Sequence, residues 1–178
     1  MRIIITIILT LSSYIVAAET INGLIEKLES KDIKAEYFPY DVSELILNKL
    51  DPGVWPDYSA LSKPEQYVMV VGDFEGQINN GGFDQYYFNS YGDNAVIAVE
   101  ALRAIGANET AELLIKSFGV FPANTPSPIR DIRCAQLESL TLKQNEFLSS
   151  LDDQFYRYPN DLAALLTKYI KSNLGAFQ

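Results

Sequence analysis

The chain has 178 residues, of which 48% are hydrophobic and 21% charged, so it can form the core of one domain of ordinary size. Its 14 Lys and Arg against 23 Asp and Glu give a net charge of −9, which argues against nucleic acid as a direct ligand, because phosphates are bound by clustered cations. The absence of histidine excludes Ser-His-Asp and Cys-His catalysis and histidine-ligated zinc. The single cysteine, Cys134, excludes an intrachain disulfide and multi-cysteine metal sites, and its apolar neighbours indicate a small buried hydrophobe. We therefore expect neither a cofactor nor a metal.

Residues 1–18 have the pattern of a secretory signal peptide. Arg2 supplies the positive charge, residues 3–16 form an apolar run, and the small residues Ala17 and Ala18 suit a cleavage site. The apolar run is shorter than the roughly 20 residues that a membrane-spanning helix needs. We expect cleavage after Ala18, a periplasmic or secreted protein and no further membrane association, with an uncleaved N-terminal membrane anchor as the alternative.

Residues 19–61 are expected to form N-terminal helices and an aromatic loop. Apolar residues at helical spacing predict a helix from Thr20 to Ser30. A start resembling a capping box at Asp41 predicts a second helix, which ends at Asp51-Pro52-Gly53. The aromatic loop over residues 54–58 follows.

Residues 62–178 are expected to form a helical domain. The capping box Ser62–Glu65 predicts a helix that Gly81-Gly82 ends. Further helices are predicted over residues 83–89, 94–105, 108–118 with Asn108 as cap, from Ser127 toward Leu148, and around Leu162 to Ile170, with a turn around Phe155 and Tyr156. The whole pattern predicts an all-α protein, a single compact domain of about seven helices after the signal peptide.

The charge excess lies in one part of the sequence. From Glu36 to Glu112 there are 13 acidic residues and only three basic ones, Lys49, Lys63 and Arg103, which gives this block a net charge of −10. Such a block either solvates helix faces or forms a negative surface that attracts a basic partner.

The densest motif runs from Glu75 to Asp93. Its segment Asn79-Asn80-Gly81-Gly82 tolerates left-handed backbone and can turn the chain sharply between two helices. The aromatic residues that follow are expected to fill the space between those helices. The amide side chains are expected to satisfy backbone groups at helix ends.

These residues resemble a bacterial all-helical family of largely unknown function that includes a DNA-mimic protein. The resemblance covers roughly residues 62–177. Its mark is the core Asn79-Asn80-Gly81-Gly82-Phe83, followed by Gln85, Tyr86, Phe88, Asn89 and Ser90. Later matches are Leu151-Asp152, Phe155-Tyr156, Asp161-Leu162 and Tyr169-Ile170. The resemblance implies an acidic protein whose carboxylates imitate DNA phosphates and occupy the DNA-binding surface of a transcription factor.

Five acidic residues in or beside this core are the candidates for binding such a partner. They are Asp73, Glu75, Asp84, Asp93 and Glu100, chosen for charge density and not as matched family positions. A signal peptide would separate the protein from cytoplasmic transcription factors. We therefore expect a non-enzymatic, exported binding module that docks a basic protein surface, such as that of a DNA-binding protein, a nuclease or a toxin.

Two other functions stay open at this point. Glu75 together with Asp84 or Asp93 could form the carboxylate pair of a hydrolase that acts on a glycan, which requires both side chains in one cleft. A structural component of the cell envelope is the other alternative.

Overall fold

The computed structural model describes residues 20–50 and 57–177. The predicted signal peptide, the predicted helix end at Asp51-Pro52-Gly53 and most of the aromatic loop lie outside the described residues. Within them, the chain forms eight α-helices and no strand: α1 (Ile21–Ser30), α2 (Phe38–Leu47), α3 (Lys63–Phe88), α4 (Ala95–Ile105), α5 (Asn108–Ser117), α6 (Arg130–Glu138), α7 (Leu142–Phe155) and α8 (Leu162–Ser172). The prediction of a compact all-α domain of about seven helices is confirmed.

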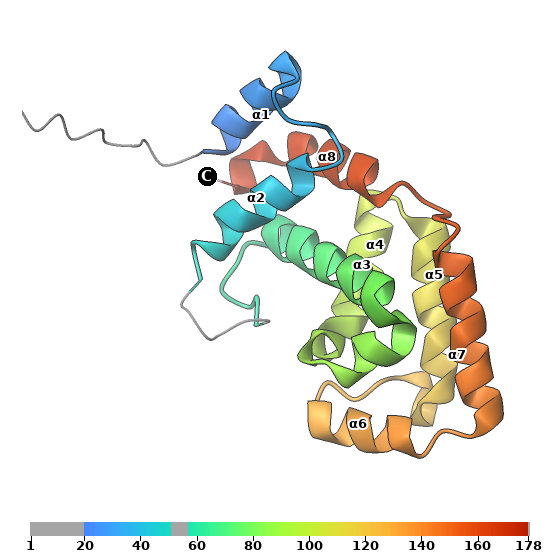
Figure 1. Cartoon of the computed structure of the whole chain (residues 1–178). Coiled ribbons are helices and arrows are strands. Elements are labelled where there is room, and N and C mark those ends of the chain that lie inside the picture. The colour runs from blue at the N-terminus through green and yellow to red at the C-terminus, as the bar shows by residue number, and fades with distance from the viewer. Residues whose placement is uncertain (1–19, 51–56, 178) are drawn as a thin grey trace, which may run out of the picture.

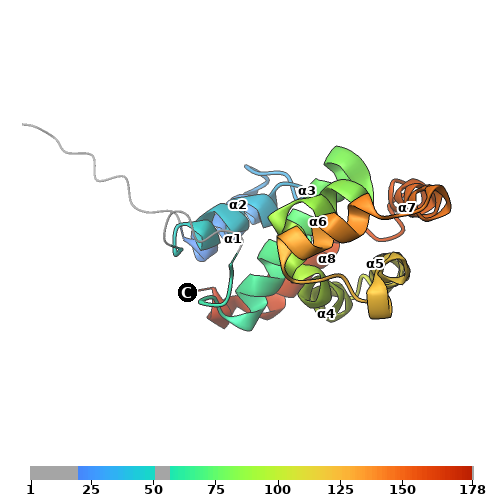
Figure 2. The ribbon, with the colours of Figure 1, turned by 90° about the horizontal axis from the view of Figure 1, so that it is seen from below.

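Helix α3 is the centre of the fold. It packs against α2, α4, α6, α7 and α8, and Figure 1 shows it crossing the middle of the molecule. Helices α5 and α7 lie side by side in both views, and α6 closes the end of the molecule opposite α1 and α2 (Figures 1 and 2). Across the described part of the chain, no helix combines the length and the apolar character needed to cross a membrane.

The start of α3 is the predicted capping box. The Ser62 hydroxyl accepts a hydrogen bond from the Glu65 backbone N–H, and the Glu65 carboxylate accepts one from the Ser62 backbone N–H at 2.9 Å. Pro64 lies in the first turn, where no backbone donor is lost. Glu65 is buried and also accepts a hydrogen bond of 2.6 Å from the Lys49 ammonium. Although burial raises the pKa of Glu65, the bonds from Lys49 and Ser62 outweigh it and lower that pKa overall.

Aromatic side chains fill the core around α3, as predicted. Phe74 makes edge-on contacts with Tyr86 and Phe155 and a tilted contact with Phe83. All four side chains are at most 1% exposed. Aromatic packing therefore holds the residues after Gly82 against the part of α3 before Gly81 and against α7.

Three predicted helix boundaries are wrong. Helix α2 begins at Phe38, not Asp41, because Phe38 and Pro39 are buried and Pro39 suits a first turn. Asn108 is the first residue of α5 and not its cap. Helix α7 continues to Phe155, so the predicted turn begins only after that residue.

The predicted long helix from Ser127 toward Leu148 is two helices. Helix α6 ends at Glu138, and α7 begins after Thr141, whose hydroxyl accepts a hydrogen bond from the Gln144 backbone N–H. The Gln144 side chain in turn accepts one from the Thr141 backbone N–H at 3.0 Å, which completes a capping box. Cys134 lies on α6. It was expected to be buried, but the structure shows it only half-buried.

Candidate functional site

The glycines of the motif break α3 into two segments. Gly82 has a φ of 71° and a ψ of −168°, a backbone conformation that is strained for any residue with a Cβ atom. Gly81, with φ −174°, is extended and also leaves helical geometry. The predicted sharp turn between two helical segments is confirmed.

Asp152 of α7 caps the second segment. Its Oδ1 accepts a hydrogen bond of 2.8 Å from the backbone N–H of Phe83. A Cβ atom at Gly82 would lie 2.4 Å from Oδ2 of the same carboxylate, so only glycine lets Asp152 approach. Sequence reasoning did not assign this role to Asp152, although Leu151-Asp152 was among the later family matches.

Two tyrosines that follow α7 bind the first segment near its end. The Tyr156 hydroxyl donates to the Ile78 carbonyl at 3.0 Å, and the Asn79 amide donates to the Tyr158 hydroxyl at 2.8 Å. Two further amides of the motif also bond to a side chain. The Gln85 and Asn89 amides both donate to Oε1 of Gln77, at 3.3 and 2.7 Å. The expectation that these amides satisfy backbone groups is therefore wrong for Asn79, Gln85 and Asn89.

Arg133 of α6 is fully buried and binds the end of α3. Its guanidinium donates to the carbonyls of Tyr87, Asn89 and Ser127 at 2.6–2.8 Å. It also donates to Oδ1 of Asp93 at 2.7 Å. Nothing in the sequence pattern distinguished Arg133 from a surface cation, since its role depends on carbonyls from distant segments.

Two of the five candidate acidic residues are buried or half-buried. Glu75 is only 6% exposed, and burial raises the pKa of its carboxyl, which is hydrogen-bonded to Tyr40. Asp73 is half-buried and accepts a hydrogen bond of 2.5 Å from the Tyr58 hydroxyl. Burial raises the pKa of Asp73 to about 7. The expectation that Glu75 forms part of an acidic surface is wrong, because α3 turns it inward.

The other three candidates are exposed but lie in different surroundings. Asp93 pairs with the buried Arg133, and Glu100 pairs with Lys63 at 3.1 Å. Asp84 lies in a groove, where it is joined by acidic residues from other helices. The five residues therefore do not form one site.

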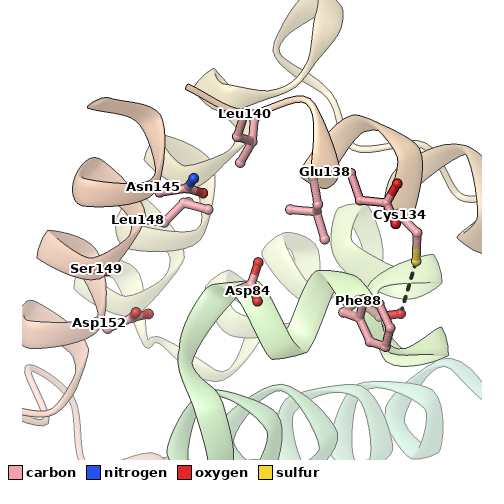
Figure 3. Close-up of a pocket in the computed structure, with 10 residues that line it drawn as sticks. Asp84, Phe88, Cys134, Glu138, Leu140, Asn145, Leu148, Ser149 and Asp152 are labelled. Carbon is pink, nitrogen blue, oxygen red and sulfur yellow. Dashed lines mark hydrogen bonds between the residues drawn. The ribbon is translucent and has the colours of Figure 1, made fainter. Parts of the chain in front are cut away.

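Asp84 lines a groove that the sequence did not predict. It has a volume of about 530 Å³ and lies between the second segment of α3, α6 and α7 (Figure 3). Its lining combines carboxylates with apolar side chains, namely Asp84, Glu138 and Asp152 with Phe88, Leu137, Leu140 and Leu148. No lysine or arginine is among the described residues that line it.

The carboxylate pair of a hydrolase is not formed by the predicted residues. Glu75 faces α2 and α8 in a small cavity with Tyr40, Ser43 and Leu166, whereas Asp84 faces α6 and α7. Asp93 is held by Arg133. In the part of the chain that the structure describes, no group of three or more acidic or cysteine side chains is arranged to hold a metal ion.

The comparisons with known proteins give one match. A family model described as "DMP19-like protein" matches residues 59–173, a span that holds the glycine turn, the groove and helices α3 to α8. No curated protein matches the chain, and no solved structure does.

Proposed function

The chain belongs to the DMP19-like family, and from that premise we propose that it is an acidic protein-binding module that docks a basic protein surface in the manner of a DNA mimic. In this proposal the carboxylates occupy positions on the partner that would otherwise hold phosphates. The partner is a DNA-binding protein, a nuclease or a toxin with a cationic surface.

The observation that carries the proposal is that the bases of the acidic block are already engaged. Within the block from Glu36 to Glu112, Lys49 pairs with Glu65, Lys63 with Glu100, and Arg103 with Glu112. Several further acidic residues of the block are exposed: Glu44, Asp57, Asp84 and Glu109. In this proposal these exposed carboxylates pair with cations of the partner, and the net negative charge accelerates the encounter.

The scaffold supports the proposal as well. A mimic needs carboxylates held at fixed positions, since a mobile acidic tail would lose conformational entropy on docking. Asp84 and Glu109 lie on helices, and the Glu109 carboxylate accepts a hydrogen bond from the Asn160 amide that restrains it.

Export is part of the proposal. The pattern of residues 1–18 supports a partner outside the cytoplasm. N-terminal sequencing of the expressed protein tests this part: a chain that starts at Glu19 agrees with it, and an intact Met1 in the cytoplasmic fraction contradicts it.

Docking is tested by capture from an envelope extract on the immobilised protein, at low and at high salt. We expect basic proteins to be retained at low salt and released at high salt. The double variant Glu44→Gln/Asp84→Asn, which loses two exposed charges, should retain less. The matched control Lys63→Gln/Glu100→Gln removes an exposed ion pair without changing the net charge and should retain as much as the wild type. Equal retention at both salt concentrations would contradict electrostatic docking.

A further inference from the structure

We infer that the groove between α3, α6 and α7 holds a cationic amphipathic segment of the partner, in which a lysine or arginine is flanked by apolar side chains. This inference rests on the proposed function and assigns its docking contact to one place on the molecule.

The groove is built from one face of each helix. Helix α7 contributes Asn145, Leu148, Ser149 and Asp152, which are spaced so that they follow one side of the helix. Figure 3 shows these side chains facing those of α6 across an open space, with Asp84 rising into it from α3. A partner segment that entered here would contact three helices at once.

The apolar part of the groove is incompletely covered. Leu148 and Leu137 form buried parts of the lining, whereas Phe88 at its edge is 49% exposed. Leu142, which is outside the lining, is 74% exposed and lies one turn before Asn145 on the same side of α7. Covering these side chains with apolar groups of a partner removes hydrophobic surface from water, which favours binding by about 25 cal/mol per Å².

Among the residues that the structure describes, no lysine or arginine lines the groove to pair with its carboxylates. The carboxylates come from three separate helices, with Asp84 on α3, Glu138 on α6 and Asp152 on α7. Burial raises the pKa of Asp152, and the neighbouring charges of Asp153 and Asp84 raise it further. Arg130, which stacks on the ring of the lining residue Phe88, donates to the Phe88 carbonyl at 2.9 Å.

The carboxylates, the apolar lining and the volume of the groove together determine which ligand fits it. Three carboxylates repel a nucleic acid or a fatty acid, and the apolar lining leaves a purely polar cation poorly matched. The volume of about 530 Å³ falls in the range of pockets that take small ligands, so it suits a few side chains of a docked segment. A few buried contacts of this kind can supply most of the energy of an interface.

The test compares two lysine substitutions on adjacent residues of α7. Ser149 lines the groove and Ser150 does not, and both are exposed helical residues. Ser149→Lys puts a cation into the groove, whereas Ser150→Lys changes the net charge equally outside it. Lysine has a better helix propensity than serine, so both variants should fold, as the thermal unfolding midpoint will show.

The probe is a synthetic peptide in which a lysine is flanked by leucines on the same face. Its affinity is measured by titration, and its site is mapped by amide chemical shifts on the isotope-labelled protein. We expect shifts in α6, α7 and residues 83–88, a loss of about tenfold or more in affinity for Ser149→Lys, and a change of less than about twofold for Ser150→Lys. A lysine-only peptide should bind more weakly than the amphipathic one.

The outcomes separate this inference from the proposed function. Salt-sensitive binding that maps elsewhere, or that both variants weaken equally, overturns the groove as the docking site and leaves the acidic module intact. Absence of binding by either cationic peptide at low salt counts against both.

Discussion

At the scale of single residues, Gly82 explains why the motif needs glycine. Its φ of 71° disfavours a side chain, and its missing Cβ leaves room for the Asp152 carboxylate that caps Phe83. We expect Gly82→Ala to lower the free energy of unfolding by about 2 kcal/mol or more, from backbone strain and the displaced cap. Denaturant unfolding measures this change.

The matched control is Gly76→Ala in the first segment of α3. A Cβ atom there would meet nothing within 4 Å, and the position is helical. We expect it to stabilise the protein by about 0.5–1 kcal/mol, because alanine is the better helix former. Equal effects of the two substitutions would contradict the role given to Gly82.

Titration of Asp73 makes the stability of the folded protein depend on pH. Its pKa of about 7 in the folded protein lies above the ordinary value of 3.8, so between these two values the folded protein binds more protons than the unfolded chain. The stabilisation that this group contributes is therefore complete below about pH 4, and it is lost as the pH rises through about 7.

Asp73→Asn removes this titration, and its amide oxygen can still accept the Tyr58 hydroxyl bond. We expect the variant to gain stability over the wild type as the pH rises from about 4 to 8, by up to about 1.4 kcal/mol per unit of pKa shift. Denaturant unfolding of both proteins across this range is the measurement. Glu75 and Asp152 titrate in both proteins, so the difference between them isolates Asp73. Parallel pH profiles would contradict the raised pKa.

At the scale of elements, Arg133 joins α6 to the end of α3. Removing it by Arg133→Met leaves the carbonyls of Tyr87 and Asn89 without this donor in a buried place. We expect a loss of about 3–5 kcal/mol in the free energy of unfolding, because an unpaired buried polar network is strongly destabilising. Arg103→Met, which breaks the exposed pair with Glu112, should cost less than about 1 kcal/mol. Similar losses in the two variants would show that Arg133 does not hold the elements together.

The elements that the sequence predicts well are those with local signals. The capping box at Ser62 and the glycine turn at Gly82 act within a few residues, so their consequences are visible in the pattern. The break between α6 and α7 was missed because Leu137, Leu140 and Leu148 continue a helical spacing across it. The Thr141–Gln144 capping box is the signal that could have located it.

The candidate site could be predicted only in part. Asp84 was a candidate, but Glu138 and Asp152, which share its groove, come from helices far along the sequence. The burial of Glu75 likewise depends on α2 and α8 packing over it. Tertiary contacts decide these placements, and a pattern of residue types does not contain them.

At the scale of the whole molecule, the main feature is the excess of negative charge. The net charge of −9 arises from an acidic block whose three bases are held in ion pairs, and the family match places most of that block in a DMP19-like protein. Asp84 and Glu109 lie on helices, so their backbone positions are fixed before any partner arrives, and the docking proposed above would not have to order them.

We propose that this negative charge binds a basic protein. The most direct measurement is the affinity for a partner captured at low salt, titrated at about 50 mM and about 200 mM salt. Salt screens the attraction between exposed charges, so we expect a drop of about tenfold or more between these concentrations. An affinity that stays the same at both concentrations would contradict the claim.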